Sequence, residues 1–276
     1  MKNQKICIIG DGLAGLSTTL TLKNLDLDLD VFYKKTNNFK QDNRTTAISE
    51  TNFQFLSKQI KLKKEYFWPC KKISLFYENK KEKINFLNYS GNKKNLMYIF
   101  ENKKIRSSIL AHLKKCKNVN LFNKNITSVN SKDTSIIFGN KKKYYDLIIL
   151  CLGNNSVVYN DLFKSRNIIK DYNEVAITGI VTHNLKIENP SQYFKTEGPL
   201  AILPFKKNKF SFVWSLKKNI YLQHYKKLIN LVNSEIKSTY GKIKCKVLNL
   251  QTFPIYMNLR TQYSKKNILI FGEGIH

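Results

Sequence analysis

The sequence predicts an α/β protein in which a parallel strand–helix–strand unit is interleaved with a mostly antiparallel β-sheet. Three observations support this prediction: a glycine-rich turn follows an apolar run at residues 5–9, a second continuous apolar run occupies 147–152, and residues 210–216 alternate strictly. Continuous apolar runs are typical of buried parallel strands, whereas alternation is typical of sheets with one buried face. The first unit is therefore Rossmann-like.

The N-terminal motif carries most of this prediction. The apolar run at 5–9 leads into Gly10-Asp11-Gly12-Leu13-Ala14-Gly15, which matches G-x-G-x-x-G. Residues 16–24 are then typical of a helix, and residues 29–33 of a second strand. This strand–turn–helix–strand context distinguishes the motif from a glycine-rich turn that has no ligand.

Each position of the motif has a physical role. Gly10 permits a tight turn, Gly12 lets a pyrophosphate approach the backbone because it has no Cβ, and Gly15 lets the helix pack closely on the sheet. Leu13 and Ala14 begin the helix, whose free N–H groups and dipole favour an anion. We therefore expect these five residues to bind the pyrophosphate of a dinucleotide.

The acidic residue that usually ends the second strand and binds a ribose hydroxyl is absent. Lys34 or Lys35 holds that place, and Asp30 lies earlier, where we interpret it as an outward-facing strand residue. A lysine here would suit a phosphate, as in NADP binding. The turn alone does not choose between NAD and FAD.

Several later segments follow one family pattern. They read Asp-Asn-Arg-Thr-Thr-Ala-Ile-Ser at 42–49, Tyr-Ile-Phe-Glu-Asn-Lys-Lys-Ile-Arg from 98, Gly-Pro-Leu-Ala-Ile-Leu-Pro at 198–204, Val-Trp-Ser at 213–215 and Ile-Leu-Ile-Phe-Gly-Glu-Gly-Ile-His at 268–276. In this order the chain resembles the ubiquinone-biosynthesis FAD-dependent hydroxylases. These are class A flavoprotein monooxygenases, of which p-hydroxybenzoate hydroxylase is the type.

The resemblance implies roles for further residues. Arg44 would reach the FAD phosphate or the flavin region, and the alternative is a surface arginine. Glu101 and Arg106 would lie near the cofactor, and the alternative is ordinary charge at a helix start. Gly272 and Glu273 would meet the ribitol or pyrophosphate from the end of a strand.

A second family fingerprint, A-D-G-x-x-S, follows the strand predicted at 145–150. Here it reads Cys151-Leu152-Gly153-Asn154-Asn155-Ser156, so Gly153 and Ser156 fit, and Gly153 joins the predicted cofactor-binding residues. Leu152 replaces an aspartate that the family ties to FAD and NAD(P)H handling. We interpret Cys151 as a small core residue because no histidine base lies near it in sequence.

The resemblance also implies a domain layout. Residues 1–66, 98–170 and 258–276 would form the FAD-binding domain, and 67–97 and 171–257 a substrate domain, in which we expect a helix over 221–240. Family members continue beyond the position of His276 with a proline- and glycine-rich loop, so we expect a C-terminally truncated chain that binds FAD weakly.

The implied function is FAD-dependent monooxygenation. FAD would be reduced by NAD(P)H or another electron donor, and one oxygen of O2 would pass to a small prenylated aromatic substrate, a polyprenyl phenol of ubiquinone biosynthesis. The expected partners are a membrane surface or a ubiquinone-biosynthesis complex. The alternative is a degenerate FAD-fold protein that binds a nucleotide or a partner without catalysis. The segments at 42–49 and 198–204 disfavour an NAD-dependent dehydrogenase.

The net charge of +29 does not by itself indicate nucleic-acid binding. The chain has four arginines, so 48 − 4 = 44 of its basic residues are lysines, whereas phosphate and base recognition usually relies on arginine. We attribute the charge to solvated positions, with attraction to an anionic membrane as the alternative. The apolar runs are far shorter than the ~20 residues of a membrane helix, so we expect a cytoplasmic protein, soluble or peripheral on the inner membrane face.

Cysteine and histidine do not form a metal or hydrolase pattern in the sequence. The five cysteines are scattered without metal-ligand spacing, which favours reduced thiols. His183 lies in a predicted strand and is interpreted as structural, and no Ser/His/Asp arrangement is evident.

Overall fold

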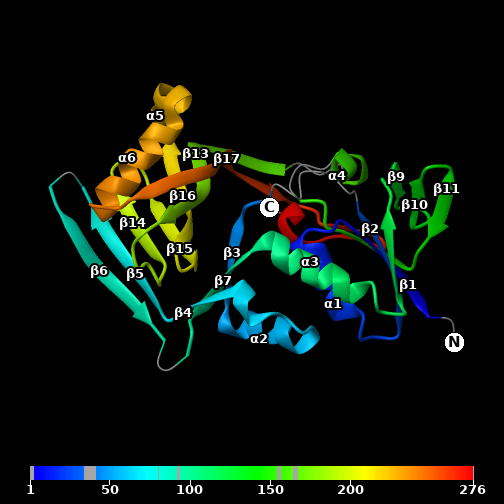
Figure 1. Ribbon diagram of the computed structural model, residues 1–276. Helices are drawn as coiled ribbons and strands as arrows, with labels where there is room; N and C mark the ends of the chain where they lie inside the picture. Colours follow the sequence, from blue (N-terminus) through cyan, green and yellow to red (C-terminus); the bar gives the residue numbers. More distant parts are fainter. Residues whose placement is uncertain are drawn as a thin grey trace. The chain divides into compact units, whose positions relative to one another are not determined.

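The computed structural model describes residues 3–33, 42–79, 81–91, 94–153, 157–163 and 167–275. The chain forms two compact units. The first consists of 1–41, 105–170 and 257–276, and the second of 42–104 and 171–256 (Figure 1).

The predicted domain layout assigned 42–66 and 98–104 to the first unit, whereas the structure groups them with the second. The reason is strand pairing: β3 (Thr45–Ser49) and β4 (Phe67–Cys70) both pair with β7 (Met97–Glu101) in one three-stranded sheet. These segments therefore cannot separate without breaking their shared ladder.

The first unit contains the predicted strand–helix–strand motif and the strands that extend it. Its elements are β1 (Gln4–Ile9), α1 (Leu13–Leu22), β2 (Leu27–Tyr33), the end of α3 (Asn102–Leu113), β8 (Val119–Asn123), β9 (Ser128–Asn130), β10 (Ser135–Phe138), β11 (Lys141–Tyr144), β12 (Leu147–Leu150), α4 (Val157–Leu162), β18 (Ser264–Lys265), β19 (Ile268–Ile270) and the 3-10 turn η4 (Gly272–Ile275).

The main sheet of this unit has the order β18-β19-β12-β1-β2-β8. β1 is an internal strand that runs parallel to both β2 and β12, and β12 runs parallel to β19. Ile6 to Ile9 of β1 are all buried, as a strand covered on both faces requires. The prediction of a parallel Rossmann-like sheet is confirmed, and its first strand lies away from the edges.

Asp30 is not the outward-facing residue that the sequence suggested. It is buried in β2, where the Tyr145 hydroxyl donates to its Oδ2 at 2.7 Å and the Asn120 amide donates to its Oδ1 at 3.0 Å. Lys143 completes the group as an ion pair. The interpretation from strand alternation was wrong here because β2 is covered on both faces. A carboxylate is tolerated in such a place when it is paired and hydrogen-bonded.

The second unit is mostly β-sheet. Its elements are β3, α2 (Glu50–Gln59), the 3-10 turn η2 (Lys64–Tyr66), β4, β5 (Lys72–Glu78), β6 (Lys83–Ser90), β7, most of β13 (Asn167–His183), β14 (Ser191–Lys195), β15 (Leu200–Lys206), β16 (Lys209–Lys217), α5 (Lys218–His224), the 3-10 turn η3 (Tyr225–Lys227), α6 (Leu228–Tyr240) and most of β17 (Cys245–Arg260).

Its large sheet has the order β17-β13-β16-β15-β14-β5-β6. The pairs around β16 are antiparallel, and β14 and β5 form a parallel pair. Phe210, Phe212 and Trp214 of β16 are all buried on one face, which confirms the predicted alternation. They pack in a core that includes Val232 and Ile236 of α6.

The helix expected over 221–240 is broken into α5, η3 and α6. Val232 and Ile236 of α6 face the core at helical spacing, whereas Leu222 and Tyr225 are exposed. Ile220 and Tyr221 of α5 nevertheless pack against the same core, and the 3-10 turn η3 separates the two helices. His183 is buried against the Phe210 ring, as a structural histidine would be. In the described part of the chain, no helix is long and apolar enough to cross a membrane.

Candidate functional site

The predicted glycines of the first unit gather at the carboxyl ends of its central parallel strands. Ile9 pairs with Leu150, and Leu150 pairs with Ile270, so the ends of β1, β12 and β19 are aligned. The turns that start at Gly10, Cys151 and Phe271 therefore leave the sheet along one edge. This is where open α/β sheets bind their ligands.

Gly12 leaves open space above the first turn of α1. It is the N-cap of this helix, and a Cβ built on it would meet no atom within 4 Å. The N–H groups of Leu13, Ala14 and Gly15 occupy the first helical turn, where the α-helical pattern gives them no partner. An anionic group placed over Gly12 can accept from this turn and be stabilised by the helix dipole.

Gly10 and Gly15 let the turn, the helix and β12 come together. Gly10 has a φ of +116°, and a Cβ there would lie 2.2 Å from the Cys151 carbonyl oxygen. A Cβ on Gly15 would lie 2.0 Å from the Gly10 carbonyl oxygen and 3.2 Å from the Cys151 Cβ. Both positions therefore exclude any side chain, which explains why the motif needs glycine there.

Gly272 lets the end of β19 lie close to helix α1. Its φ is +76°, and a Cβ on it would lie 2.7 Å from the Cβ of Ala14. Glu273, the next residue, is exposed, and Gly153 follows β12 with a φ of +74° and open space around it. The structure thus places Gly153, Gly272 and Glu273 in the loops that follow β12 and β19.

Arg106 of α3 binds the glycine turn directly. Its guanidinium forms an ion pair with the Asp11 carboxylate, and its Nε donates to the Asp11 carbonyl oxygen at 3.1 Å. The Asp11 side chain is 7% exposed and that of Arg106 is 18% exposed. A carboxylate at this place would repel a phosphate, so Arg106 offsets its charge and holds the turn in shape.

A brace that the sequence did not reveal joins two of the loops. Arg260 is buried, donates from Nε to the Gly274 carbonyl oxygen at 2.8 Å, and lies over the Tyr159 ring with its guanidinium carbon 4.6 Å from the ring centroid. The Tyr159 hydroxyl accepts from the Leu152 N–H at 3.0 Å. The scarcity of arginine in the chain was the signal that could have found Arg260.

Arg44 and Glu101 belong to the second unit and have local partners there. Arg44 contacts both carboxylate oxygens of Asp42, at 2.9 Å and 3.1 Å, and its side chain is half exposed. Burial disfavours the ionised form of Glu101, but Lys104 at 2.8 Å and Lys206 at 3.3 Å outweigh it and hold the pKa below its usual value. Glu101 is therefore a charged, lysine-paired residue. Lys34, Lys35, Ser156 and His276 lie outside the described residues.

Three buried cysteines, Cys7 and Cys151 of the first unit and Cys70 of the second, are not poised for nucleophilic chemistry. Burial raises the pKa of Cys151 and of Cys70 to about 12, and burial also raises that of Cys7. We expect these three thiols to resist iodoacetamide at pH 8 in the native protein and all five cysteines to react after unfolding in urea, because the thiolate is the reactive form. Mass spectrometry of the labelled peptides checks this. Labelling of native Cys151 as fast as in the unfolded chain would contradict its assignment to the core.

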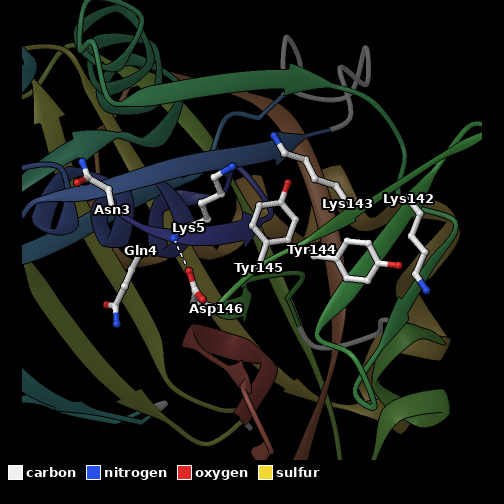
Figure 2. Close-up of a pocket in the computed structure, with 8 residues that line it drawn as sticks. All are labelled: Asn3, Gln4, Lys5, Lys142, Lys143, Tyr144, Tyr145 and Asp146. Carbon is white, nitrogen blue, oxygen red and sulfur yellow. Dashed lines mark hydrogen bonds between the residues drawn. The ribbon is translucent and has the colours of Figure 1, made fainter. Parts of the chain in front are cut away.

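A separate pocket of about 570 Å³ lies at the opposite, amino ends of β1 and β12 (Figure 2). Its lining includes Lys5, Lys143, Tyr145 and Asp146, and the Lys5 backbone N–H donates to Asp146 at 2.7 Å. The glycine turn lies at the other ends of these strands, so this pocket is not part of the candidate site. Among the described residues, no group of three or more His, Cys, Asp or Glu side chains could hold a metal ion.

The sequence matches no protein-family model and no curated protein. Solved structures do match. The p-nitrophenol 4-monooxygenase PnpA from Pseudomonas putida is 13% identical with a TM-score of 0.79, over 100% of this chain and 74% of that chain. PqsL, a probable FAD-dependent monooxygenase from Pseudomonas aeruginosa, is 13% identical with a TM-score of 0.77, over 100% of this chain and 79% of that one. CmlS, a flavin-dependent halogenase, is 12% identical with a TM-score of 0.75, over 100% of this chain and 54% of that one.

The chain has the fold of the FAD-dependent monooxygenases. The predicted fold class is thereby confirmed along the whole chain. At these identities the likeness concerns the arrangement of the backbone, so the activity has to be argued from this chain's own residues.

Proposed function

We propose that the first unit binds FAD with its diphosphate over Gly12. The observation that carries this proposal is the open space above Gly12 at the N-terminus of α1, in a fold shared with flavin-dependent monooxygenases. Of the three glycines of the motif, Gly10 and Gly15 are closely packed and shape the turn, and Gly12 has open space where a Cβ would be. These residues fit a diphosphate because backbone N–H groups and a helix dipole favour an anion there.

The other residues of the corner would support the cofactor without touching its reactive part. Arg106 would cancel the charge of Asp11 beside the diphosphate, and the contacts of Arg260 and Tyr159 would fix the loops that follow β12 and β19. Gly153, with open space around it, would allow the remainder of FAD to approach the backbone, and Gly272 lets the end of β19 pack on α1. A contact of Arg44 and Glu101 with the cofactor stays a prediction of the family resemblance.

For the whole chain we propose an FAD-dependent monooxygenase that hydroxylates an aromatic substrate, with a polyprenyl phenol of ubiquinone biosynthesis as the favoured class. Bound FAD supplies the activation of O2, and the protein supplies orientation and a dry site. The specific class rests on the family resemblance of the segments at 42–49, 98–106 and 198–204. The proposed electron donor is NAD(P)H.

One observation favours a second candidate, a protein that binds FAD or a partner without catalysis. Leu152 stands where the resembled family has an aspartate, and its backbone N–H is held by Tyr159. A leucine there can form neither the hydrogen bonds nor the charge contacts of a carboxylate.

The test supplies electrons without relying on a nicotinamide donor. The purified protein is saturated with FAD, photoreduced without oxygen and mixed with 18O2 and prenylated or unprenylated phenols. We expect one 18O atom in a hydroxylated product, with the prenylated phenols preferred. Bound FAD that reoxidises without any labelled product would refute the monooxygenase and support the non-catalytic candidate. Parallel reduction by NADH or NADPH identifies the donor.

A further inference from the structure

The β5–β6 hairpin forms the outer edge of the seven-stranded sheet (Figure 1). β6 is the terminal strand, and all of its residues from Lys83 to Ser90 are exposed. Such an edge is usually polar or charged, because an open apolar edge invites unwanted association. This edge is different, since it carries large apolar side chains.

These apolar side chains share one face of the hairpin. Tyr77 pairs directly with Ile84 across the strands and with Phe194 of β14 on its other side, so the three form a row. Leu75 pairs with Leu87, and Ile73 pairs with Tyr89, in the neighbouring rows.

An irregularity in the register places one more ring on this face. The pairing shifts between Leu75 and Phe76, and the extra residue, Phe86, packs on Phe194 with ring centroids 5.8 Å apart. We call Tyr77, Ile84, Phe86, Leu87, Tyr89 and Phe194 the apolar strip, and its members range from 39% exposed for Phe194 to 62% for Tyr89.

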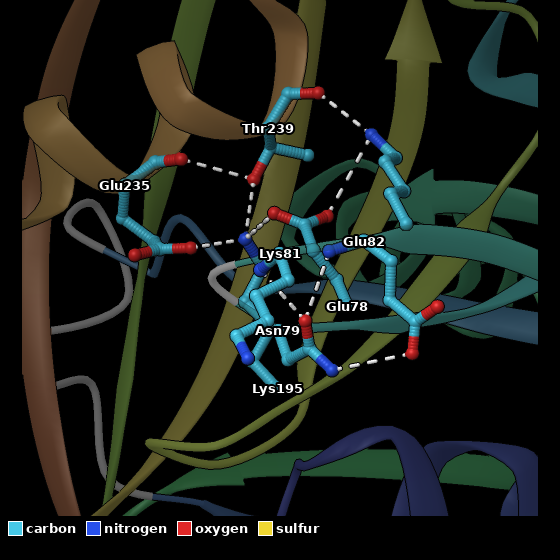
Figure 3. A network of polar contacts seen from close by, with 8 residues as sticks. Glu78, Asn79, Lys81, Glu82, Lys195, Glu235 and Thr239 are labelled. Atoms are coloured by element: carbon cyan, nitrogen blue, oxygen red, sulfur yellow. Dashed lines mark hydrogen bonds and ion pairs between the residues drawn. The ribbon is translucent and has the colours of Figure 1, made fainter.

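The opposite face of the hairpin is anchored to the unit. Phe76 stacks on Tyr193, and Lys83 donates to the Thr239 carbonyl oxygen of α6 at 2.8 Å. Lys195 is buried and forms ion pairs with Glu78 and Glu235 (Figure 3). The hairpin is therefore held rigidly by one face while the strip on the other face is presented outward.

Lysines are frequent in the hairpin and in the segments beside it. Residues 71–94 contain seven lysines and two glutamates, a local charge of 7 − 2 = +5. Lys71, Lys72, Lys81 and Lys94 are exposed, and one of the glutamates, Glu78, is already paired with Lys195 and Lys83. Apolar and aromatic side chains flanked by lysines are the composition of surfaces that lie at an anionic lipid interface.

We propose that the β5–β6 hairpin docks the protein on an anionic lipid surface, with the apolar strip inserted among the headgroups and the lysines over the lipid phosphates. A second copy of this strongly basic chain would meet like charge at the same place. Single-stranded nucleic acid would stack its bases on the aromatic rings, but such binding does not explain the exposed aliphatic side chains of Ile84 and Leu87. The proposal does not depend on the cofactor.

The test compares binding to phosphatidylcholine vesicles with and without phosphatidylglycerol, by co-sedimentation. We expect binding to the anionic vesicles and a loss of about tenfold or more in the Phe86→Thr/Tyr89→Thr variant, because buried apolar area sets interfacial affinity. The matched control is Leu222→Gln/Ile229→Gln, which removes two similarly exposed apolar residues of the same unit. It should bind like the wild type.

A charge-matched pair separates local docking from general attraction. Replacing Lys71, Lys72, Lys81 and Lys94 by Gln should weaken binding by about tenfold or more. The same change at Lys114, Lys115, Lys117 and Lys132, which are exposed in the first unit, should have a much smaller effect.

Three results would overturn the docking proposal. The first is an equal loss of vesicle binding in each variant and in its control. The second is unchanged vesicle binding by Phe86→Thr/Tyr89→Thr. The third is a wild-type dimer that this variant dissociates, which would assign the strip to contact with a second copy. Thermal unfolding confirms that each variant folds. An FAD titration of the same variants reports separately on the proposed function, because none of these residues belongs to the glycine corner.

Discussion

The variant Gly12→Val should fold normally and lose FAD. A Cβ at this position meets no protein atom within 4 Å, so we expect the free energy of unfolding to fall by ~1 kcal/mol or less, the cost of a poorer helix N-cap. The same side chain would occupy the space of the diphosphate. Hydrogen bonds to a charged group are worth ~1.5–3 kcal/mol each, so the loss of two weakens FAD binding roughly hundredfold or more.

Gly15→Ala is the matched control for this prediction. Its Cβ would lie 2.0 Å from the Gly10 carbonyl oxygen, which is backbone and cannot rotate away. We expect a destabilisation of ~3 kcal/mol, in the upper range for point mutations, with FAD binding lost as a consequence of unfolding. Thermal and urea unfolding together with FAD titration separate the two cases. A stable Gly12→Val protein that keeps its FAD affinity would show that the diphosphate does not lie there.

Arg106→Gln should damage both stability and cofactor binding. The variant leaves the Asp11 carboxylate buried without its charged partner, and breaking a buried pair in this way costs ~3–5 kcal/mol. The uncompensated carboxylate would also repel the FAD diphosphate across the turn. We therefore expect FAD affinity to fall by roughly hundredfold in protein that is still folded, measured at low temperature where the fold persists.

The double variant Asp11→Asn/Arg106→Gln distinguishes charge balance from direct phosphate contact. Removing both charges should restore most of the lost stability and a large part of the FAD affinity, because the amide carries no charge to repel the phosphates. A double variant that folds but binds FAD no better than Arg106→Gln alone would mean that Arg106 contacts the cofactor itself. Its role would then be binding rather than compensation.

The sequence was sufficient for the features that depend on local pattern. The G-x-G-x-x-G turn has sterically enforced positions, so its glycines predicted the corner that the structure contains. The alternation of Phe210, Phe212 and Trp214 predicted a buried face because side chains on a strand point to opposite sides in turn. The fold class followed from these two patterns and from the resemblance.

Features that depend on distant partners could not be predicted. Asp30 is buried because Tyr145 and Lys143, more than a hundred residues away, supply its hydrogen bond and its charge. The pairing of Arg106 with Asp11 spans ninety-five residues in the same way. The 3-10 turn between α5 and α6 contains no proline or glycine, so helical propensity alone does not predict it.

Direct titration of the purified protein with FAD tests the central claim, that the glycine corner holds a flavin dinucleotide. Flavin fluorescence and absorbance are followed as protein is added, for the wild type and for Gly12→Val, with NAD as a competitor. We predict saturable binding of one FAD per wild-type chain that NAD does not displace and that the Gly12 variant loses. No saturable FAD binding by the folded wild type, or displacement of FAD by NAD, would contradict the account.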